Sequence, residues 1–406
     1  MAVSPSAPIR VGVIGLGGAA NGMIPRFDRN PRFTVAGAAD LDAEILGRFH
    51  ERFPNAETHP NAEGLCASKN IDFIYIATPN RFHQPHTVMA LNGGKHVLVE
   101  KPMTVSLAEA DAMVEAADRN GVLLGVNVKH SFEPRIQKLR EFTKSGEFGE
   151  LRMINDWRYQ NWLYRPRTPE ELTPEWGGGI LWRQGGHQLD LMRTIGRGKV
   201  YSVRGSAQVW DKTRRVPGAH TAYFEFESGA SATCVYSGHD HFRTSELVFG
   251  FEAGKLADPA AYGQARRELA SHNYSVEWEA GAARAERFGG ERQHVQRPDE
   301  TTDEPRGGWI MGGPLLVSYD HADVKLSPKG LMIYGDEKQW EISLSTPGQD
   351  GRDFRLNAFA DAIATGRPLQ CDGRWGKATA EVLLAIEQSG RERKEVYPQY
   401  QVAYAD

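Results

Sequence analysis

Short apolar runs alternate with helix-like stretches over the first 128 residues of the chain. The apolar runs predict strands at residues 9–14, 34–39, 73–77, 96–99 and 123–127, with helices between them that include 43–53, 85–91 and 106–119. Ser106 and Glu109 have the spacing of a capping box, and Gly121 follows as a stop signal. Pro25 predicts a short or kinked first helix, because proline lacks a backbone N–H. This alternation indicates a parallel, doubly wound sheet.

The pattern changes after residue 128. A helix is expected at 134–143 and a strand at 151–159, followed by a polar, tryptophan-rich loop and a helix that starts near Gly185. Strand-like runs occupy 200–210, 223–227, 231–237 and 246–251, with a hairpin turn at 228–230, and helices at 354–365 and 375–391 close the chain. Residues 254–312 are rich in glycine, arginine and glutamate with little periodicity, so we expect an insertion or lid there. The chain thus divides into an α/β domain, 1–128, and an α+β domain, 129–406, with a mainly antiparallel sheet.

Composition narrows the class of protein. With 406 residues, 40% of them hydrophobic and 25% charged, the chain suits two ordinary globular domains. A net charge of −4 gives no basic surface for nucleic acid, and no apolar stretch approaches the roughly 18 residues of a membrane helix. The N-terminus lacks the regions of a signal peptide, and three cysteines without a CxxC spacing fit a reducing compartment. We therefore expect a cytoplasmic protein with no membrane or nucleic-acid partner.

A glycine-rich turn follows the first predicted strand. Gly15, Gly17 and Ala20 satisfy the G-x-G-x-x-G/A pattern, with Gly18 beside them, so that the backbone can approach a pyrophosphate. Asp40 ends the second strand, where a carboxylate accepts hydrogen bonds from an adenosine ribose, and its neighbour is a leucine and not an arginine or serine. The sequence therefore predicts a Rossmann dinucleotide-binding domain that prefers NAD to NADP.

Polar residues follow three further strands of this domain. Thr78, Asn80 and His83 come after the third strand, Glu100 and Lys101 after the fourth, and Asn127 ends the fifth. Ligands of open parallel sheets bind at the carboxyl ends of the strands, so we expect these residues at the nicotinamide side of the cofactor. An exposed turn or a lysine at a strand end is the alternative explanation.

Lys101 and His187 form a candidate catalytic pair. A lysine in Glu-Lys-Pro, directly after an apolar strand, can donate to a substrate hydroxyl and favour its alkoxide. His187 lies at an expected helix start and offers a general base. With a dinucleotide site, the two residues suffice for hydride transfer, which predicts an NAD-dependent dehydrogenase.

These motifs resemble the Gfo/Idh/MocA oxidoreductase family along nearly the whole chain. The resemblance rests on Gly15-Leu16-Gly17 with Asp40, on Thr78-Pro79-Asn80, on Glu100-Lys101-Pro102 and on the run from Gly177 to Asp190. It implies a Rossmann domain followed by a domain with a large open sheet, which in that family often joins dimers or tetramers. It also implies that Lys101 polarises the substrate oxygen and that His187 is the base. Asp190, one helical turn later, would orient that base or face solvent.

Arg183 departs from the family pattern. Many members carry an aspartate four residues before the histidine, where it would bond a polyol hydroxyl, whereas a guanidinium there can hold a carboxylate with two hydrogen bonds. A salt-bridged structural arginine is the alternative. Nearby aromatic residues suit a planar anionic ring, a sugar or a buried core, and we single out Tyr159, Trp162 and Trp182 as substrate-binding candidates.

A softer resemblance points to the phthalate dihydrodiol dehydrogenase branch of the family. It rests on the runs 333–337 and 372–379. The predicted substrate is therefore a ring secondary alcohol, specifically a carboxylated cis-dihydrodiol from aromatic degradation, with a sugar or cyclitol as the rival. A glycosidase that uses NAD for transient oxidation and a non-catalytic dinucleotide sensor are the other classes. His239 and His241 suit a surface or substrate-lining pair better than a metal site, since no third ligand is evident.

Overall fold

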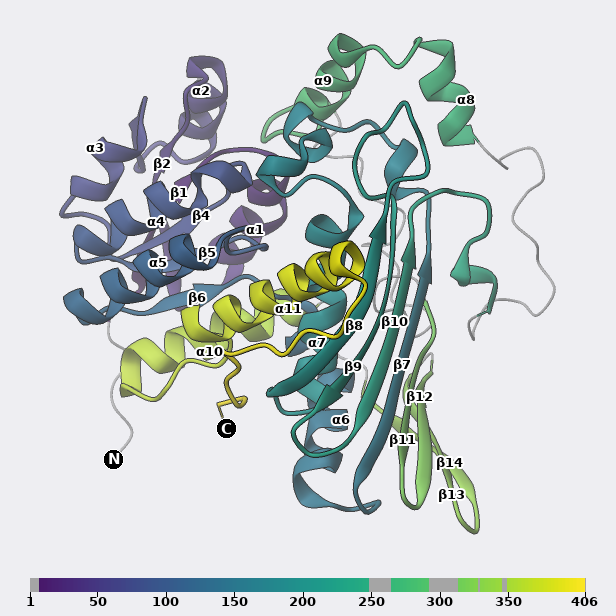
Figure 1. Cartoon of the computed structure of the whole chain (residues 1–406). Coiled ribbons are helices and arrows are strands. Elements are labelled where there is room, and N and C mark those ends of the chain that lie inside the picture. The colour runs from purple at the N-terminus through teal and green to yellow at the C-terminus, as the bar shows by residue number, and fades with distance from the viewer. Residues whose placement is uncertain (1–6, 248–263, 292–312, 328, 345–348, 406) are drawn as a thin grey trace.

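The N-terminal domain is built on a six-stranded parallel sheet. The computed structural model describes residues 7–247, 264–291, 313–327, 329–344 and 349–405. The strands follow the order β3-β2-β1-β4-β5-β6 and all neighbours run parallel, which confirms the doubly wound sheet (Figure 1). The order reverses between β1 and β4, and an open sheet binds its ligand in the crevice at this point. The strands are β1 Ile9–Ile14, β2 Phe33–Ala39, β3 Glu57–His59, β4 Phe73–Ile76, β5 His96–Val99 and β6 Leu124–Val126.

Helices cover both faces of this sheet. α1 (Gly18–Arg29) and α2 (Ala43–Arg52) pack on one face, while α3 (Ala62–Ala67), α4 (His83–Asn92) and α5 (Leu107–Asn120) pack on the other. Of the two alternatives expected for the first helix, a short or a kinked one, the short one was wrong, because α1 runs for 12 residues through Pro25. Ile24 and Phe27 flank the proline and are fully buried, so the packing of α1 outweighs the local penalty.

The start of α5 differs from its expected capping box. The Ser106 side chain makes no capping hydrogen bond. Instead, Thr104 Oγ1 accepts from the Ser106 backbone N–H at 3.1 Å and donates to the Glu109 carboxylate at 2.5 Å. The hydroxyl two residues upstream therefore replaces the predicted cap. The left-handed Gly121 ends the helix, as expected (φ 62°).

The C-terminal domain contains an eight-stranded sheet in the order β14-β13-β12-β11-β7-β10-β9-β8. Only β7 and β10 pair in parallel among the strands of this sheet that the structure describes, which confirms the mainly antiparallel expectation. The last four strands were not predicted: they are short, pair as successive hairpins and join the sheet where β11 pairs with the distant β7. The strands are β7 Leu151–Tyr159, β8 Val200–Gln208, β9 Ala219–Phe226, β10 Ser231–Ser237, β11 Leu315–Tyr319, β12 Ala322–Leu326, β13 Gly330–Gly335 and β14 Gln339–Ser343.

Three helices cover the inner face of this sheet. α6 (Pro134–Ser145), α7 (Gly186–Ile195) and α11 (Gly373–Glu392) bury their apolar sides against the strands in one core. Figure 1 shows α11 lying across the sheet between the two domains. Near the site, a π-helical turn, Leu181–Gly185, leads directly into α7.

The expected insertion contains two helices among its described residues, α8 (Gln264–Ser271) and α9 (Val276–Ala285). The strand expected at 246–251 was wrong where the structure describes it, because a 3₁₀ turn, Thr244–Leu247, occupies its start. Residues 248–251 lie outside the described residues. In the part of the chain that the structure describes, no helix is both long and apolar enough to cross a membrane.

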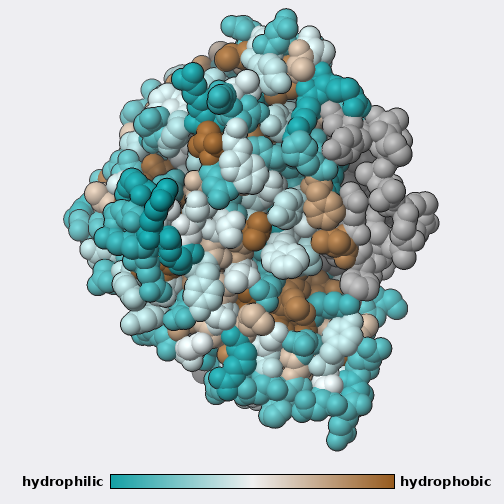
Figure 2. Space-filling model, turned by 45° about the vertical axis from the view of Figure 1, so that its right-hand side comes forward, coloured by the Kyte–Doolittle hydropathy of each residue, from teal (hydrophilic) through white to brown (hydrophobic). Residues whose placement is uncertain are grey.

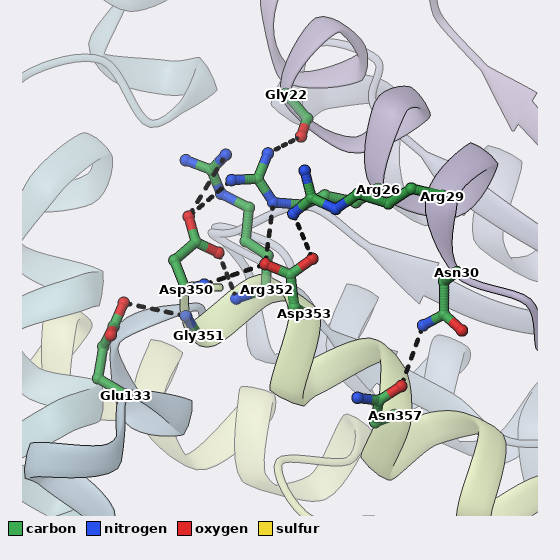
Figure 3. A network of polar contacts seen from close by, with 10 residues as sticks. All are labelled: Gly22, Arg26, Arg29, Asn30, Glu133, Asp350, Gly351, Arg352, Asp353 and Asn357. Atoms are coloured by element: carbon green, nitrogen blue, oxygen red, sulfur yellow. Dashed lines mark hydrogen bonds and ion pairs between the residues drawn. The ribbon is translucent and has the colours of Figure 1, made fainter. Parts of the chain in front are cut away.

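The last part of the chain also packs on the N-terminal domain. α10 (Gly351–Thr365) lies beside α1, and a polar network joins the two helices (Figure 3). Arg26 pairs with Asp350 at 2.8 Å, and Arg29 pairs with Asp353 at 2.6 Å. These ion pairs fix the N-terminus of α10 against the helix that follows the glycine-rich turn.

Candidate active site

The glycine-rich turn has the shape that a bound pyrophosphate requires. Gly15 has φ +88°, and a Cβ there would lie 3.0 Å from the Ala77 backbone and the Thr78 side chain. At Gly17 a Cβ would meet nothing within 4 Å, and this residue begins α1 without a side-chain cap. Open space beside uncapped backbone N–H groups at a helix start suits a phosphate. Ala20 is buried inside α1, where its small side chain allows close packing.

Asp40 lies beside this turn at the end of β2. Its Oδ2 accepts from the Leu16 backbone N–H at 2.7 Å, and its Oδ1 accepts from the Asp42 backbone N–H at 3.0 Å. Because each carboxylate oxygen can accept two hydrogen bonds, both oxygens retain capacity for a ribose hydroxyl. Leu41 is 89% exposed and leaves this edge open.

Glu100 and Asn127 lie together at the ends of β5 and β6. Glu100 accepts hydrogen bonds from the Tyr75 hydroxyl and from the Asn127 amide. This arrangement holds the loop that carries Lys101 against the sheet. Burial raises the pKa of Tyr75, so its hydroxyl stays a donor.

Lys101 and Arg183 meet across the domain boundary. Lys101 Nζ donates to the Arg183 carbonyl oxygen at 2.8 Å. Burial, opposed by the charge of Glu100, lowers the pKa of Lys101 to about 8. A lysine with this pKa can supply a positive charge near neutral pH and still exchange its proton.

The guanidinium of Arg183 points to the loop after β4. Its Nη1 donates to Asn80 Oδ1 at 3.1 Å, and its buried Nε has no hydrogen-bond partner. Among the described residues no carboxylate forms an ion pair with Arg183. Burial lowers the pKa of Arg183. A salt-bridged structural arginine, the alternative, would need a carboxylate at ion-pair distance, and the described residues offer the longer-range attraction of Glu171 and Glu170, which raises the pKa of Arg183 against the effect of burial.

His187 lies in the first turn of α7, close to Lys101. It is 9% exposed, and its ring packs edge to face on the ring of His130, with the centroids 4.9 Å apart. The pKa of His187 is well below its usual value, first because of burial and then because of the Lys101 charge. A neutral imidazole at pH 7 can accept a proton. The buried Nδ1 atoms of both rings lack partners in the described residues.

Sequence reasoning missed His130. It follows β6 by four residues, at the edge of the sheet where β1, β4 and β5 also end. The signal was available, because the carboxyl ends of parallel strands share one edge. Burial lowers the pKa of His130 well below its usual value, so this ring is neutral as well.

The comparisons with known proteins agree with this geometry. Residues 9–128 match the model of an oxidoreductase family with an NAD-binding Rossmann fold, and residues 136–257 match the GFO/IDH/MocA C-terminal domain. The chain belongs to the Gfo/Idh/MocA oxidoreductase family. The expected family and fold are thereby confirmed.

Relatives of this Gfo/Idh/MocA protein differ in substrate. A 1-carboxy-3-chloro-3,4-dihydroxycyclohexa-1,5-diene dehydrogenase from Comamonas testosteroni is 32% identical over 94% of this chain and 95% of its own length. A D-xylose 1-dehydrogenase [NADP(+)] from Haloarcula marismortui is 27% identical over 63% of this chain and 73% of its own. The solved structure of a putative dehydrogenase from Bordetella bronchiseptica is similar, with a TM-score of 0.85 and 34% identity over 96% of this chain and 100% of its own.

Several predicted site residues form hydrogen bonds within the loops that surround the candidate site. Both ring nitrogens of His83 lie near carbonyl oxygens, those of Pro102 at 2.8 Å and of Thr78 at 2.9 Å. His83 is 1% exposed, so it braces the loops after β4 and β5. The Thr78 hydroxyl pairs with the His86 ring at 3.2 Å.

Asp190 is neither exposed nor bonded to the base. It is 1% exposed and accepts hydrogen bonds from the Ser131 hydroxyl and the Trp375 indole. Asp190 therefore neither faces solvent nor orients His187, so both expectations were wrong. Its carboxylate anchors α7 to the loop after β6 and to α11. Asp190 lies one helical turn after His187, yet its carboxylate bonds to the Ser131 and Trp375 side chains and not to the His187 ring.

The aromatic substrate candidates belong largely to the core. Trp162 is 1% exposed beneath the Arg167 guanidinium, and Trp182 is 3% exposed and donates to Glu387 at 2.9 Å. Apolar packing buries both tryptophans, so the expectation that they contact a substrate was wrong. Tyr159 packs on Phe242 at the end of β7.

His239 and His241 point to different partners. His239 stacks on Trp210, with the ring centroids 4.6 Å apart, whereas His241 Nε2 lies 2.9 Å from an Arg266 nitrogen. The described residues hold no group of three histidine, cysteine or acidic side chains that could bind a metal ion.

Proposed function

We propose that the protein is an NAD-linked dehydrogenase that oxidises a secondary alcohol on a carboxylated ring. The observation that carries this proposal is Arg183, which forms no ion pair among the described residues, has a buried Nε without a hydrogen-bond partner, and accepts a hydrogen bond from Lys101 through its backbone carbonyl. A substrate carboxylate would neutralise it with two hydrogen bonds. The same contact would place the ring between the two domains.

The chemistry follows from the roles of three side chains. Arg183 would orient the ring, Lys101 would donate to the hydroxyl oxygen and stabilise the developing alkoxide, and the neutral imidazole of His187 would accept the hydroxyl proton. A nicotinamide cofactor, when bound, supplies the acceptor for the hydride that leaves the carbinol carbon. The alcohol thus loses one proton to the protein and one hydride to the cofactor.

A carboxylated cis-dihydrodiol is the substrate that we favour. Its oxidation leads toward an aromatic ring, and the Comamonas relative, by its name, acts on a carboxylated dihydroxycyclohexadiene. The sugar or cyclitol alternative is supported by relatives such as the xylose dehydrogenase. A glycosidase that oxidises only transiently remains a third candidate from the family resemblance.

One substrate panel separates these functions. Purified protein would be incubated with NAD and, in turn, a phthalate-type cis-dihydrodiol, an inositol, an aldose and an aryl glycoside, while NADH absorbance is recorded. We expect NADH from the dihydrodiol and little from the neutral compounds. NADH from the inositol or aldose alone would establish the rival, and aglycone release without NADH would establish the glycosidase.

We also propose that the outer face of the eight-stranded sheet joins two copies of the chain. Side chains alternate along each strand, and the outward positions carry exposed large apolar residues, whereas their neighbours are buried. Figure 2 shows that hydrophobic residues, in brown, interrupt the hydrophilic surface on this side of the molecule. The exposed residues are Met153, Trp157, Tyr223, Leu316 and Tyr334. Such a surface suits a dimer or tetramer.

Three buried, unpaired cysteines support the proposal of a reducing cytoplasm.

A further inference from the structure

The insertion reaches the glycine-rich turn of the cofactor domain. Residues 286–290 follow α9 and lie on that turn. The Phe288 backbone N–H donates to the Leu16 carbonyl oxygen at 3.1 Å. The Asn21 side chain, on α1, donates to the Glu286 carbonyl oxygen. A segment of the second domain therefore bonds to the turn that would hold the dinucleotide.

Phe288 fixes this segment in place. Its side chain is 2% exposed and joins the core cluster that contains Leu16 and Ile45. Its ring lies 5.9 Å from the ring of Phe49 on α2. Because burying a large apolar side chain is favourable, this contact holds the neighbouring residues at a defined position.

Arg287 is held beside the adenosine edge of the site. Its Nη1 lies 3.7 Å from Asp42 Oδ2, and the two side chains are 41% and 40% exposed. The backbone N–H of Asp42 donates to Asp40, the residue expected to meet the adenosine ribose. The guanidinium thus stands at the edge of the sheet where NAD and NADP differ.

The chemistry of that edge determines cofactor choice in Rossmann domains. An acidic residue after the second strand bonds the ribose 2′-hydroxyl of NAD, and a nearby arginine accommodates the 2′-phosphate of NADP. The next residue in this chain is Leu41, which cannot bind phosphate. A cation here has to come from elsewhere in the chain, and Arg287 meets that need.

We propose that Arg287 is a cofactor-specificity residue that binds the 2′-phosphate of NADP, so that the protein accepts both dinucleotides. The inference rests on the proposed dinucleotide-dependent function. Asp40 favours NAD, and Arg287 supplies the affinity for NADP. Its 3.7 Å contact with Asp42 is longer than a hydrogen bond, so the half-exposed side chain can exchange that partner for a phosphate.

The test measures binding and needs no substrate. The dissociation constants of NADH and NADPH would be determined by fluorescence titration for wild type, Arg287→Ala and the control Arg284→Ala, whose side chain is exposed one turn earlier on α9. We expect measurable NADPH binding by wild type. Arg287→Ala should weaken it about tenfold while NADH binding changes less than about twofold, and Arg284→Ala should change neither.

Each other result has a defined meaning. Equal losses for NADH and NADPH, or no loss, would overturn the role of Arg287, as would a wild type that binds NADH and not NADPH. Binding of neither dinucleotide by wild type would overturn the proposed function itself. Asp42→Asn keeps an oxygen that can cap α2 but removes the charge that competes with phosphate for Arg287. This substitution should therefore tighten NADPH binding more in wild type than in the Arg287→Ala background.

Discussion

His130 and His187 meet edge to face in the site, with ring centroids 4.9 Å apart and an interplanar angle of 85°. The two rings come from distant segments of the chain, from the loop after β6 and from the start of α7. Burial keeps both neutral. The proposed base is therefore positioned by a residue of the loop that follows the last strand of the cofactor domain.

We predict that His130→Ala impairs the base without abolishing the site. A cavity beside His187 would admit water and reduce the burial that lowers its pKa, so this pKa should rise. The acid limb of the kcat/KM profile should then move to higher pH, and kcat should fall by about tenfold, less than the 10² to 10⁴ expected when a general base is removed, as in His187→Ala. His130→Phe, which keeps a buried ring, should leave the limb in place. An unchanged limb in the alanine variant would exclude the positioning role.

Lys101 should produce an alkaline limb near pH 8. Its pKa is lowered to about 8 by burial, so the ammonium loses its proton, and the site its cation, as the pH rises through that value. The rate of alcohol oxidation should therefore decrease above about pH 8. Lys101→Arg should show no such limb within the measured range, since the guanidinium stays charged, and Lys101→Ala should lose a factor on the order of 10² to 10⁴. An alkaline limb that persists in Lys101→Arg would assign it to another group.

Arg183 should discriminate between anionic and neutral substrates. Arg183→Ala is expected to weaken a carboxylated ring by roughly 1.5 to 3 kcal/mol, the range for a hydrogen bond involving charge. A neutral analogue of the same ring should bind wild type and variant about equally. Arg183→Lys should recover part of the loss, because an ammonium cannot form the two-pronged contact. Equal losses for both substrates, measured as KM or as inhibitor binding, would make Arg183 structural.

Asp40 should set the preference for NAD. Asp40→Ser removes the carboxylate that would face a 2′-phosphate, so the ratio of NADPH to NADH affinity should increase. Thermal unfolding of the variant provides the control, because Asp40 also accepts the Leu16 and Asp42 backbone N–H groups. Wild-type turnover that is faster with NADP than with NAD at equal concentration would contradict the prediction.

The outer face of the large sheet can be tested by a single charge. Trp157→Arg places a cation among exposed apolar side chains, and it should shift the protein toward monomers in sedimentation velocity experiments. Trp210→Arg is a matched control, since Trp210 is also exposed but follows the end of β8 and lies outside the sheet. Equal sedimentation of wild type and Trp157→Arg would exclude this interface.

Local patterns predicted the first domain well. β1 begins and ends where the apolar run does, and the glycine pattern marks the turn after it, because strand burial and backbone freedom are encoded over a few residues. The capping box failed because Thr104, outside the pattern, competes for Glu109. The sequence also could not distinguish a helix from a loop in α9, a short amphipathic segment that is fixed by distant partners. Its Glu279 accepts from the Arg167 backbone and pairs with Arg214.

The candidate site was predicted in part, for a similar reason. Residues at strand ends, such as Lys101, could be located because the topology of a parallel sheet places them. The burial of Trp182 and Asp190 and the contact of His130 with His187 depend on how segments far apart in the sequence pack together. No local periodicity reports such a contact.

The placement of α10 has a consequence for the order in which the chain folds during synthesis. Phe359 packs on Phe73 of β4, with ring centroids 4.9 Å apart, and Leu356 lies in the same core cluster as β1 and α1. A ribosome completes residues 9–126 long before it reaches α10, so the part of the sheet face that α10 covers, beside α1, stays exposed in the interval. The core of the N-terminal domain is thus complete only after α10 emerges from the ribosome.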